Sequence, residues 1–299
     1  MQPALGAAFL VDYLDNSLRD EDDLAKATRL PVLAVIPKLK DWKPTDVHVI
    51  TREQPTSPPA EAYRSLRTAV QFLGIDRRMK IIQVTSPRQG EGKTTTSTNL
   101  AVTCARAGQR VVLVDCDLRR PSLHRIFSQN DVPGLSDLLV DADHTAQSVR
   151  HLTALNLDFI PDGTEPPNPT QLLNSDKMRV FLASAHERYD YVVLDVPPLL
   201  PVADALILAS QVDLNVLVIE SCRIPEKLAL RALKSLHSHG AAPAGAVLND
   251  KTGKGARYYG AYSYYEGKYY QGYYRRNEPA PPVPGWRKLL EKVWGFVNG

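Results

Sequence analysis

A glycine-rich segment that ends in Gly92, Lys93 and Thr94 is the part of the sequence best suited to chemistry. Residues 86–95 read Ser-Pro-Arg-Gln-Gly-Glu-Gly-Lys-Thr-Thr and follow an apolar run, Ile81 to Val84. Glycines let backbone N–H groups turn towards phosphate oxygens, and a helix N-terminus adds a partial positive charge. Lys93 would neutralise charge on the β- and γ-phosphates, and the Thr94 hydroxyl would bind Mg²⁺. The segment therefore predicts a site for ATP and Mg²⁺, formed by Gly90, Glu91, Gly92, Lys93, Thr94 and Thr95.

This segment departs from the strict phosphate-loop pattern at one position. Pro87 stands where the pattern has its first glycine. A glycine-rich turn with a surface lysine is the alternative interpretation. The predicted strand before the segment and the predicted helix after it favour the phosphate loop.

Three carboxylates follow two further apolar runs, each at the point where the run ends. Asp115 and Asp117 come after Val111 to Val114, and Asp195 comes after Tyr191 to Leu194. The carboxyl ends of parallel strands meet at one edge of a sheet, where its ligands bind. We therefore expect Asp195 to reach the metal through water. Asp115 and Asp117 lie two residues apart, so one of them is expected to face the metal while the other packs differently.

The tyrosines are unevenly distributed along the chain. There are 13 Tyr against 6 Phe, and nine of the tyrosines lie between Tyr258 and Tyr274. Residues 251–299 carry nine Lys and Arg against three Glu, so this tail has a charge of +6 and the rest of the chain −3. A tail with so little aliphatic content can extend and offer hydroxyl groups to an active site. The alternative is a low-complexity aromatic tail without such a role.

Short apolar runs alternate with helical patterns through the middle of the chain. This alternation predicts an α/β fold: a mostly parallel sheet covered by helices on both faces. A short helix is expected within Asn16 to Leu30, where acidic residues precede apolar ones. Strands are expected at 32–36, 81–84, 111–114, 191–194, 214–219 and 244–248, and helices at 61–73 and 94–107.

Three further segments have distinct compositions. Residues 37–59 contain five prolines and predict a linker, and residues 279–284 form a Pro-rich spacer. Trp286 to Val297 has the spacing of a short amphipathic helix. This helix would lie on an anionic membrane, or equally pack against its own domain or a partner.

Composition excludes several classes of protein. With 43% hydrophobic and 23% charged residues, the chain is neither disordered nor collagenous. Cys104, Cys116 and Cys222 have no pairing pattern and predict reduced cytosolic thiols, and the histidines show no metal-ligand spacing. The net charge of +3 does not by itself demand a nucleic-acid partner, and none is expected. The uncharged start, Gln2 to Val11, is too short to span a bilayer, so we expect a cytoplasmic protein that lies against a membrane.

Taken together, these motifs resemble the bacterial protein-tyrosine kinases (BY-kinases), which act in capsule and exopolysaccharide export. The resemblance covers residues 10 to 275. It rests on the phosphate loop, Asp115-x-Asp117-x-Arg119, Asp195-x-Pro197-Pro198 and the tyrosine-rich tail. It also includes Glu61-x-x-Arg64-x-x-Arg67, Pro166-Pro167-Asn168-Pro169 and Val247-Leu248-Asn249. Arg88 stands where the related MinD and ParA ATPases have a signature lysine, which favours the kinase branch.

The resemblance implies roles for individual residues. Lys93 and Thr94 would bind phosphates and Mg²⁺, with Asp117 and Asp195 supporting the metal. Asp115 or Asp117 would receive the tyrosine proton, and Arg119 would assist charge neutralisation. Asn249 would contact adenine. Glu61, Arg64 and Arg67 would form a subunit contact, and the phosphate acceptors would be Tyr258, Tyr259, Tyr262, Tyr264, Tyr265, Tyr269, Tyr270, Tyr273 and Tyr274.

The resemblance also implies a domain organisation and partners. Residues 1–37 would be the cytoplasmic end of a chain-length determinant (Wzz-like) region, whose membrane-spanning part is not in this chain, as in a truncated or split member. Residues 38–59 would be the linker, 60–250 the MinD/ParA-like P-loop kinase domain and 251–299 the tail. The partners would be a ring of identical subunits, a Wzz-like membrane activator and a cognate tyrosine phosphatase.

These expectations compete with two other functions. A MinD/ParA-like ATPase would switch partners with its nucleotide state, without phosphorylating protein. A non-catalytic scaffold would need neither Lys93 nor the carboxylates. The tyrosine tail and Arg88 favour an autokinase that acts in trans within a ring, which phosphorylation of the tail would then disperse.

Overall fold

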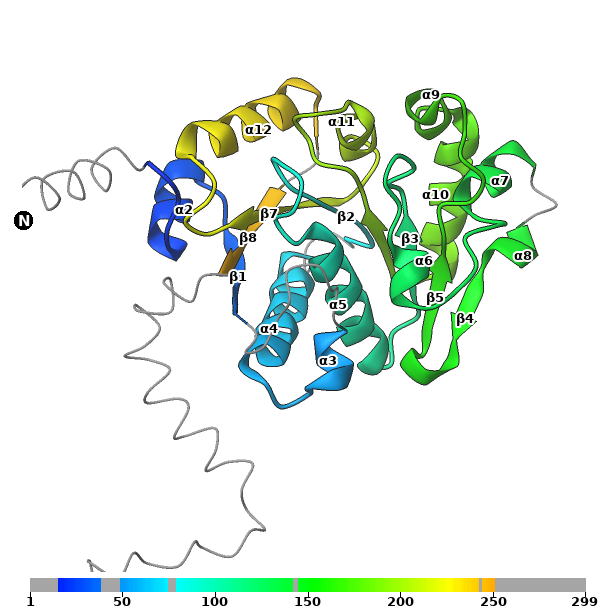
Figure 1. The fold of residues 1–299 in the computed structure, drawn as a ribbon, viewed down its shortest axis with the longest axis horizontal. Helices are drawn as coiled ribbons and strands as arrows, with labels where there is room; N and C mark the ends of the chain where they lie inside the picture. The colour runs from blue at the N-terminus through cyan, green and yellow to red at the C-terminus, as the bar shows by residue number, and fades with distance from the viewer. Residues whose placement is uncertain (1–15, 39–48, 75–78, 142–144, 242–243, 251–299) are drawn as a thin grey trace, which may run out of the picture. The chain divides into compact units, whose positions relative to one another are not determined.

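The centre of the protein is an eight-stranded sheet with the order β1-β8-β7-β2-β6-β3-β5-β4. The computed structural model describes residues 16–38, 49–74, 79–141, 145–241 and 244–250 (Figure 1). Every neighbouring pair of strands is parallel except β4 and β5, which are antiparallel. The α/β fold with a mostly parallel sheet is therefore confirmed.

The strands and helices are short, as is usual for such a sheet. The strands are β1 (Val32–Pro37), β2 (Ile81–Thr85), β3 (Val111–Asp115), β4 (Arg150–Leu152), β5 (Leu157–Ile160), β6 (Tyr191–Asp195), β7 (Leu214–Glu220) and β8 (Ala244–Asp250). The helices are α2 (Glu21–Thr28), α3 (Ile50–Glu53), α4 (Pro58–Leu73), α5 (Lys93–Arg106), α6 (Leu123–Ile126), α7 (Leu135–Val140), α8 (Thr145–Ser148), α9 (Pro169–Leu173), α10 (Asp176–Arg188), α11 (Asp204–Ala209) and α12 (Glu226–Ser238). One 3₁₀ helix spans Thr153–Leu155.

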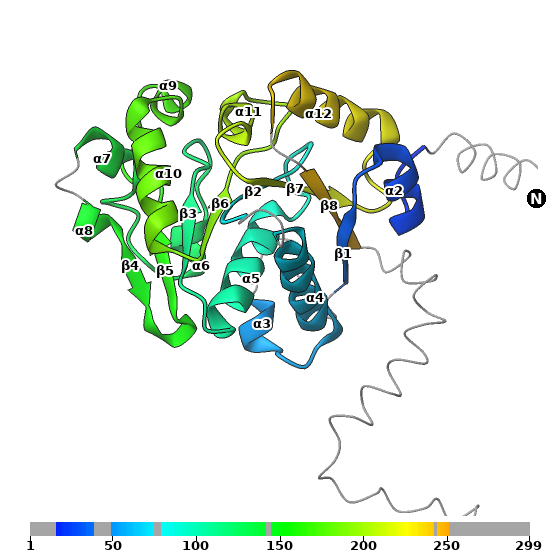
Figure 2. The ribbon, with the colours of Figure 1, turned by 180° about the vertical axis from the view of Figure 1, so that it is seen from behind.

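Helices cover both faces of the sheet. Figures 1 and 2 show α3, α4 and α5 on one face and α2, α11 and α12 on the other. Successive strand residues point to opposite faces: Val112 and Val114 belong to the apolar cluster of one face, and Val111 and Leu113 to that of the other. Because both faces are buried, the strands are continuous apolar runs rather than alternating ones.

The predicted strands are all present, and each is one or two residues longer than predicted. Two strands were not predicted, β5 and the edge strand β4. The latter is only three residues long and contains Arg150 and His151, so its composition lacks the apolar run on which the prediction depends.

The predicted division into residues 1–37, a linker and a kinase domain needs correction. β1 pairs in parallel with β8, from Val32–Ala246 to Pro37–Asp250. Residues 32–37 therefore belong to the same sheet as β2, the strand that precedes the phosphate loop. Helix α2, capped by Asp20, contacts α12. The apolar residues of this segment are thus part of the main core.

The predicted linker contains helical structure at its C-terminal end. Helix α4 begins at Pro58, with Ser57 as its N-cap. Proline fits the first turn of a helix because its missing N–H has no partner there, so these prolines start a helix rather than extend a linker. Helix α3 packs its buried Thr51 against α5, where the Asn99 side chain accepts hydrogen bonds from the Thr51 N–H and hydroxyl.

Candidate active site

The phosphate loop lies between β2 and α5, as predicted. Gly90 and Gly92 have φ angles of 88° and 95°. Side chains with a Cβ rarely adopt this region, which explains glycine at both positions. Gly92 is the N-cap of α5 and has no side chain to cap the helix, so the first N–H groups of α5 face the loop. This arrangement fits an anion such as a phosphate.

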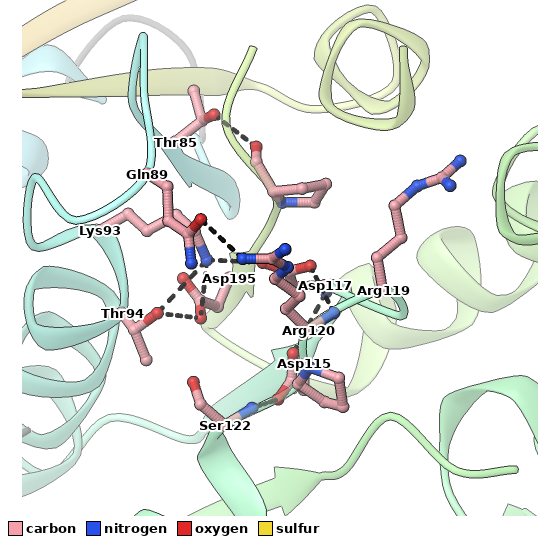
Figure 3. Close-up of polar contacts among 12 residues, drawn as sticks. Thr85, Gln89, Lys93, Thr94, Asp115, Asp117, Arg119, Arg120, Ser122 and Asp195 are labelled. Atoms are coloured by element: carbon pink, nitrogen blue, oxygen red, sulfur yellow. Dashed lines mark hydrogen bonds and ion pairs between the residues drawn. The ribbon is translucent and has the colours of Figure 1, made fainter. Parts of the chain in front are cut away.

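Lys93 is buried between two of the predicted carboxylates. Its Nζ lies 2.9 Å from Asp117 Oδ2 and 3.7 Å from Asp195 Oδ2 (Figure 3). Burial acts to lower the pKa of Lys93, but the charges of Asp195 and Asp117 outweigh it and hold the pKa above its usual value. The ammonium is therefore charged and is held next to the phosphate loop by Asp117 and Asp195.

Thr94 and Asp195, both predicted to support the metal, contact each other. The Thr94 hydroxyl donates to Asp195 Oδ2 over 2.7 Å. The other oxygen, Oδ1, is buried and has no hydrogen-bond partner within the described part of the chain. The hydroxyl of Ser97, which lies near this carboxylate, donates to the Thr94 carbonyl. Burial raises the pKa of Asp195, against the opposing charge of Lys93. A carboxylate oxygen without a partner beside a threonine hydroxyl and Asp117 fits Mg²⁺, which prefers oxygen ligands and retains several waters.

Asp115 supports the loop that follows β3. Its Oδ1 accepts the N–H of Asp117, and its Oδ2 accepts the N–H groups of Ser122 and Leu123, each at 3.1 Å. The carboxyl group is completely buried, and burial together with the charge of Asp195 raises its pKa to about 8. Of the two candidate bases, Asp115 thus orders residues 115–123, while Asp117 faces Lys93.

Arg119 does not lie at the phosphate loop, contrary to its predicted role. Its guanidinium donates to both carboxylate oxygens of Asp204, at 2.6 and 3.3 Å, and to the hydroxyl of Thr170. Figure 3 shows Arg119 extending away from Lys93 and Asp195. Asp204 is 1% exposed, and a buried carboxylate needs such a partner. The side chain of Arg119 therefore holds the loop after β3 against α9 and α11.

The Pro-Pro-Asn-Pro motif has a related structural role. The side chain of Asn168 caps α9 by accepting the N–H of Gln171, and Pro169 occupies the first helical position. This cap places Thr170, whose hydroxyl also donates to Asp204. The motif thus supports the loop that carries Asp115 and Asp117.

Sequence reasoning missed Arg120, which reaches the phosphate loop. Its Nη1 donates to Oε1 of Gln89 over 2.9 Å, and its backbone N–H donates to Asp117 Oδ1. Two consecutive arginines carry no sequence signal that tells which of them faces the site.

Glu91 and Asn249 were both predicted to bind the nucleotide. Their side chains form hydrogen bonds to the backbone of the phosphate loop and stabilise it. The buried carboxyl group of Glu91 accepts the N–H of Arg88, and burial raises its pKa to about 8. The amide of Asn249 donates to the Glu91 carbonyl over 2.9 Å. The guanidinium of Arg223 pairs with Glu220 and lies beside Gly90 of the loop. This contact was not predicted.

The predicted subunit-contact residues on α4 divide into two kinds. Arg64 is bonded to Glu61 and to the carbonyl of Pro55 on the outside of the helix. Arg67 instead turns towards α5, where its Nη1 donates to the Thr103 carbonyl over 3.4 Å. Arg64 and Arg67 therefore have different neighbours within the chain, and the subunit contact of the three residues stays a prediction.

Several predictions concern residues outside the described part of the chain. These are the nine tail tyrosines and the amphipathic segment Trp286 to Val297. Among the described residues, no helix is long and apolar enough to cross a membrane. Cys104 and Cys116 are buried and Cys222 is half-buried, and all three are free thiols.

The chain is similar to known proteins over most of its length. A family model described as "AAA domain" matches residues 79–238. The tyrosine-protein kinase YwqD of Bacillus subtilis is 38% identical over 218 residues, which cover 73% of this chain and 91% of YwqD. The putative tyrosine-protein kinase EpsB of Ralstonia solanacearum is 34% identical over 91% of this chain. This chain spans only 38% of the length of EpsB.

A solved structure agrees with these similarities. The kinase domain of the Escherichia coli tyrosine kinase ETK superposes with a TM-score of 0.72 at 30% identity. The match covers 77% of this chain and 92% of that domain. The residues matched by the family model, 79–238, contain the phosphate loop and the three carboxylates.

Proposed function

The chain belongs to the bacterial tyrosine-protein kinases, and from this premise we propose that it transfers the γ-phosphoryl group of ATP to the tyrosines of its own C-terminal tail. The observation that carries the proposal is the cluster of Lys93, Thr94, Asp117 and Asp195 at the mouth of the phosphate loop. The described tyrosines, Tyr63, Tyr189 and Tyr191, are buried or half-buried. The tail therefore offers the best acceptors.

The reaction needs positioning and charge neutralisation more than covalent catalysis. The loop N–H groups and Lys93 would hold the β- and γ-phosphates. Thr94, Asp117 and Asp195 would hold Mg²⁺, which neutralises phosphate charge when bound. The tyrosine oxygen forms a bond to the γ-phosphorus as the bond to the ADP oxygen breaks, and the phenolic proton passes to Asp115 or Asp117.

Acceptor tyrosines would come from a neighbouring subunit in a ring-like assembly. Each phosphotyrosine adds about −1.5 to −2 charges, so four would add about −6 to −8. This cancels the +6 of the tail. Repulsion between acidic tails would then disperse the ring. Phosphorylation of the tails would thus cause the subunits to dissociate.

The test is incubation of the full chain with labelled ATP and Mg²⁺, followed by mapping of phosphotyrosine. We expect label within residues 258–274. A chain with all nine tail tyrosines replaced by phenylalanine is the matched control and should take up little label. Release of ADP without label on protein would instead select the MinD/ParA-like ATPase.

Two further measurements address the assembly. A Lys93→Met chain of distinguishable mass, mixed with the natural chain, should acquire phosphotyrosine if transfer occurs in trans. Native mass measurement should show a homo-oligomer that becomes smaller after ATP is added. A ring that stays intact with phosphorylated tails would contradict the release mechanism.

The biological setting belongs to the same proposal. We infer that the protein regulates capsule or exopolysaccharide polymerisation and export from the cytoplasmic face of the plasma membrane. A Wzz-like membrane protein would activate it, and a tyrosine phosphatase would reverse it. Support comes from the family and from the amphipathic pattern of Trp286 to Val297. Co-sedimentation with anionic liposomes tests the membrane contact, and its absence would remove that part of the proposal.

A further inference from the structure

Two consecutive arginines after β3 have opposite directions. Arg119 is held by Asp204 and Thr170, on the side away from the phosphate loop. Arg120 extends towards the loop, where Nη1 lies 2.9 Å from Gln89 Oε1 (Figure 3). A guanidinium thus spans the distance from the loop after β3 to the phosphate loop.

The position of Arg120 is fixed at its backbone rather than along its side chain. Its N–H donates to the Asp117 carbonyl and to Asp117 Oδ1, both at 3.1 Å. The other carboxylate oxygen of Asp117 pairs with Lys93. The backbone of Arg120 is therefore bonded to a residue of the phosphate site. Among the described residues, its exposed side chain is held by one hydrogen bond, to Gln89, which is itself exposed.

The Arg120–Gln89 hydrogen bond is of a kind that a phosphate oxygen can replace. The amide oxygen of Gln89 is a neutral acceptor, whereas a phosphate oxygen is charged, and hydrogen bonds between ions are roughly twice as strong as neutral ones. A guanidinium presents five N–H donors in a planar fork that matches phosphate geometry. An anion seated in the phosphate loop would therefore compete well for Arg120.

We propose that Arg120 leaves Gln89 to bind the γ-phosphate of ATP, as an arginine supplied by the same chain. Its charge would add to that of Lys93 in stabilising the transferring phosphoryl group. This inference rests on the proposed function, since it concerns the same nucleotide. It assigns to Arg120 the neutralising role that the family resemblance implied for Arg119.

The test compares binding of a non-hydrolysable ATP analogue and of ADP, each with Mg²⁺, to the full chain. Only the analogue carries a γ-phosphate. Arg120→Ala should weaken binding of the analogue about 10-fold or more and that of ADP less than about 3-fold. Arg120→Lys, which keeps the charge without the fork, should give an intermediate loss.

Two other variants serve as matched controls. The quantity compared is the affinity for the ATP analogue divided by the affinity for ADP. Arg119→Ala removes the neighbouring arginine and should leave this ratio unchanged. Gln89→Ala removes the resting partner of Arg120 and should leave the ratio unchanged or increase it. A ratio that stays unchanged in Arg120→Ala, or that falls equally in Gln89→Ala, would show that Arg120 only links the two loops and would overturn the proposal.

Kinase assays keep this result separate from the proposed function. Arg120→Ala should lower kcat by about 100-fold or more, as expected for loss of a donor that acts in the transition state. If the natural chain labels no tyrosine while Arg120→Ala still loses the preference for the ATP analogue, the proposed function fails and this inference stands. Normal tyrosine labelling with an unchanged ratio overturns this inference alone.

Discussion

The ammonium of Lys93 forms an ion pair with Asp117, with 2.9 Å between Nζ and Oδ2. The lysine belongs to the first turn of α5 and the aspartate to the loop after β3, so this contact joins the phosphate loop to the predicted metal site. Both side chains are about nine-tenths buried. A buried pair of this kind is costly to break from one side, because the remaining charge loses its partner.

Replacement of this lysine should therefore affect both activity and stability. We expect Lys93→Met to reduce tyrosine labelling by at least about 100-fold and the free energy of unfolding by about 2–4 kcal/mol. The double variant Lys93→Met with Asp117→Asn should recover part of the stability and none of the activity. Urea denaturation of both variants provides the measurement, and unchanged stability in Lys93→Met would contradict it.

Loss of the Thr94 hydroxyl should weaken metal binding. Thr94→Val keeps the shape of the side chain and removes the group that contacts Asp195. The Mg²⁺ concentration for half-maximal labelling should rise about 10-fold or more. Thr98→Val is the matched control, since the buried Thr98 hydroxyl has no hydrogen-bond partner among the described residues. Equal effects of the two substitutions on the Mg²⁺ requirement would argue against Thr94 as a ligand.

Arg119 should contribute to stability through Asp204. Among the described side chains, Arg119→Ala leaves the buried carboxylate of Asp204 with Thr170 as its remaining partner, and should lower the free energy of unfolding by about 1–3 kcal/mol. The exposed pair Arg110–Asp190 offers a control, because solvent screens its attraction. Arg110→Ala should thus change stability little. A similar small effect of both substitutions, measured by urea denaturation, would be at odds with this assignment.

The stability of the protein should depend on pH through Glu91. Its pKa is about 8 in the folded chain against an ordinary value of 4.5, mainly because it is buried. Between these pH values the unfolded chain has released the proton that the folded chain retains, so stability falls as the pH rises. Glu91→Gln should match the natural chain near pH 5 and exceed its free energy of unfolding by about 1–3 kcal/mol at pH 9.

Denaturation of both chains from pH 5 to 9 checks this dependence on Glu91. The same substitution at the exposed Glu187 is the control and should give no pH-dependent difference. A constant difference between Glu91→Gln and the natural chain across the range would mean that Glu91 is ionised throughout.

The two arginines of α4 should have separable effects. Arg64 lies on the outside of the helix, so Arg64→Ala should reduce the native mass of the assembly without changing the melting temperature. Arg67 is bonded to α5, and Arg67→Ala should lower the free energy of unfolding by about 1 kcal/mol. An unchanged oligomer in Arg64→Ala would remove Arg64 from the subunit contact.

The sequence alone determined most strands of the sheet and the residues proposed for the phosphate site. Strands buried on both faces are continuous apolar runs in the sequence. The order of Gly90, Gly92, Lys93 and Thr94 between a predicted strand and a predicted helix is typical of a phosphate loop. The carboxylates after β3 and β6 were predictable because the carboxyl ends of parallel strands share one edge. These inferences depend on local patterns and on one general rule of topology.

Tertiary structure decided what local patterns do not specify. The direction of Arg119 depends on Asp204, 85 residues further along the chain, and that of Arg120 on Gln89, 31 residues before it. The place of β1 in the sheet likewise depends on its pairing with β8. A side chain on a loop adopts the direction in which its charge finds a partner, and that partner is brought near only when the chain folds.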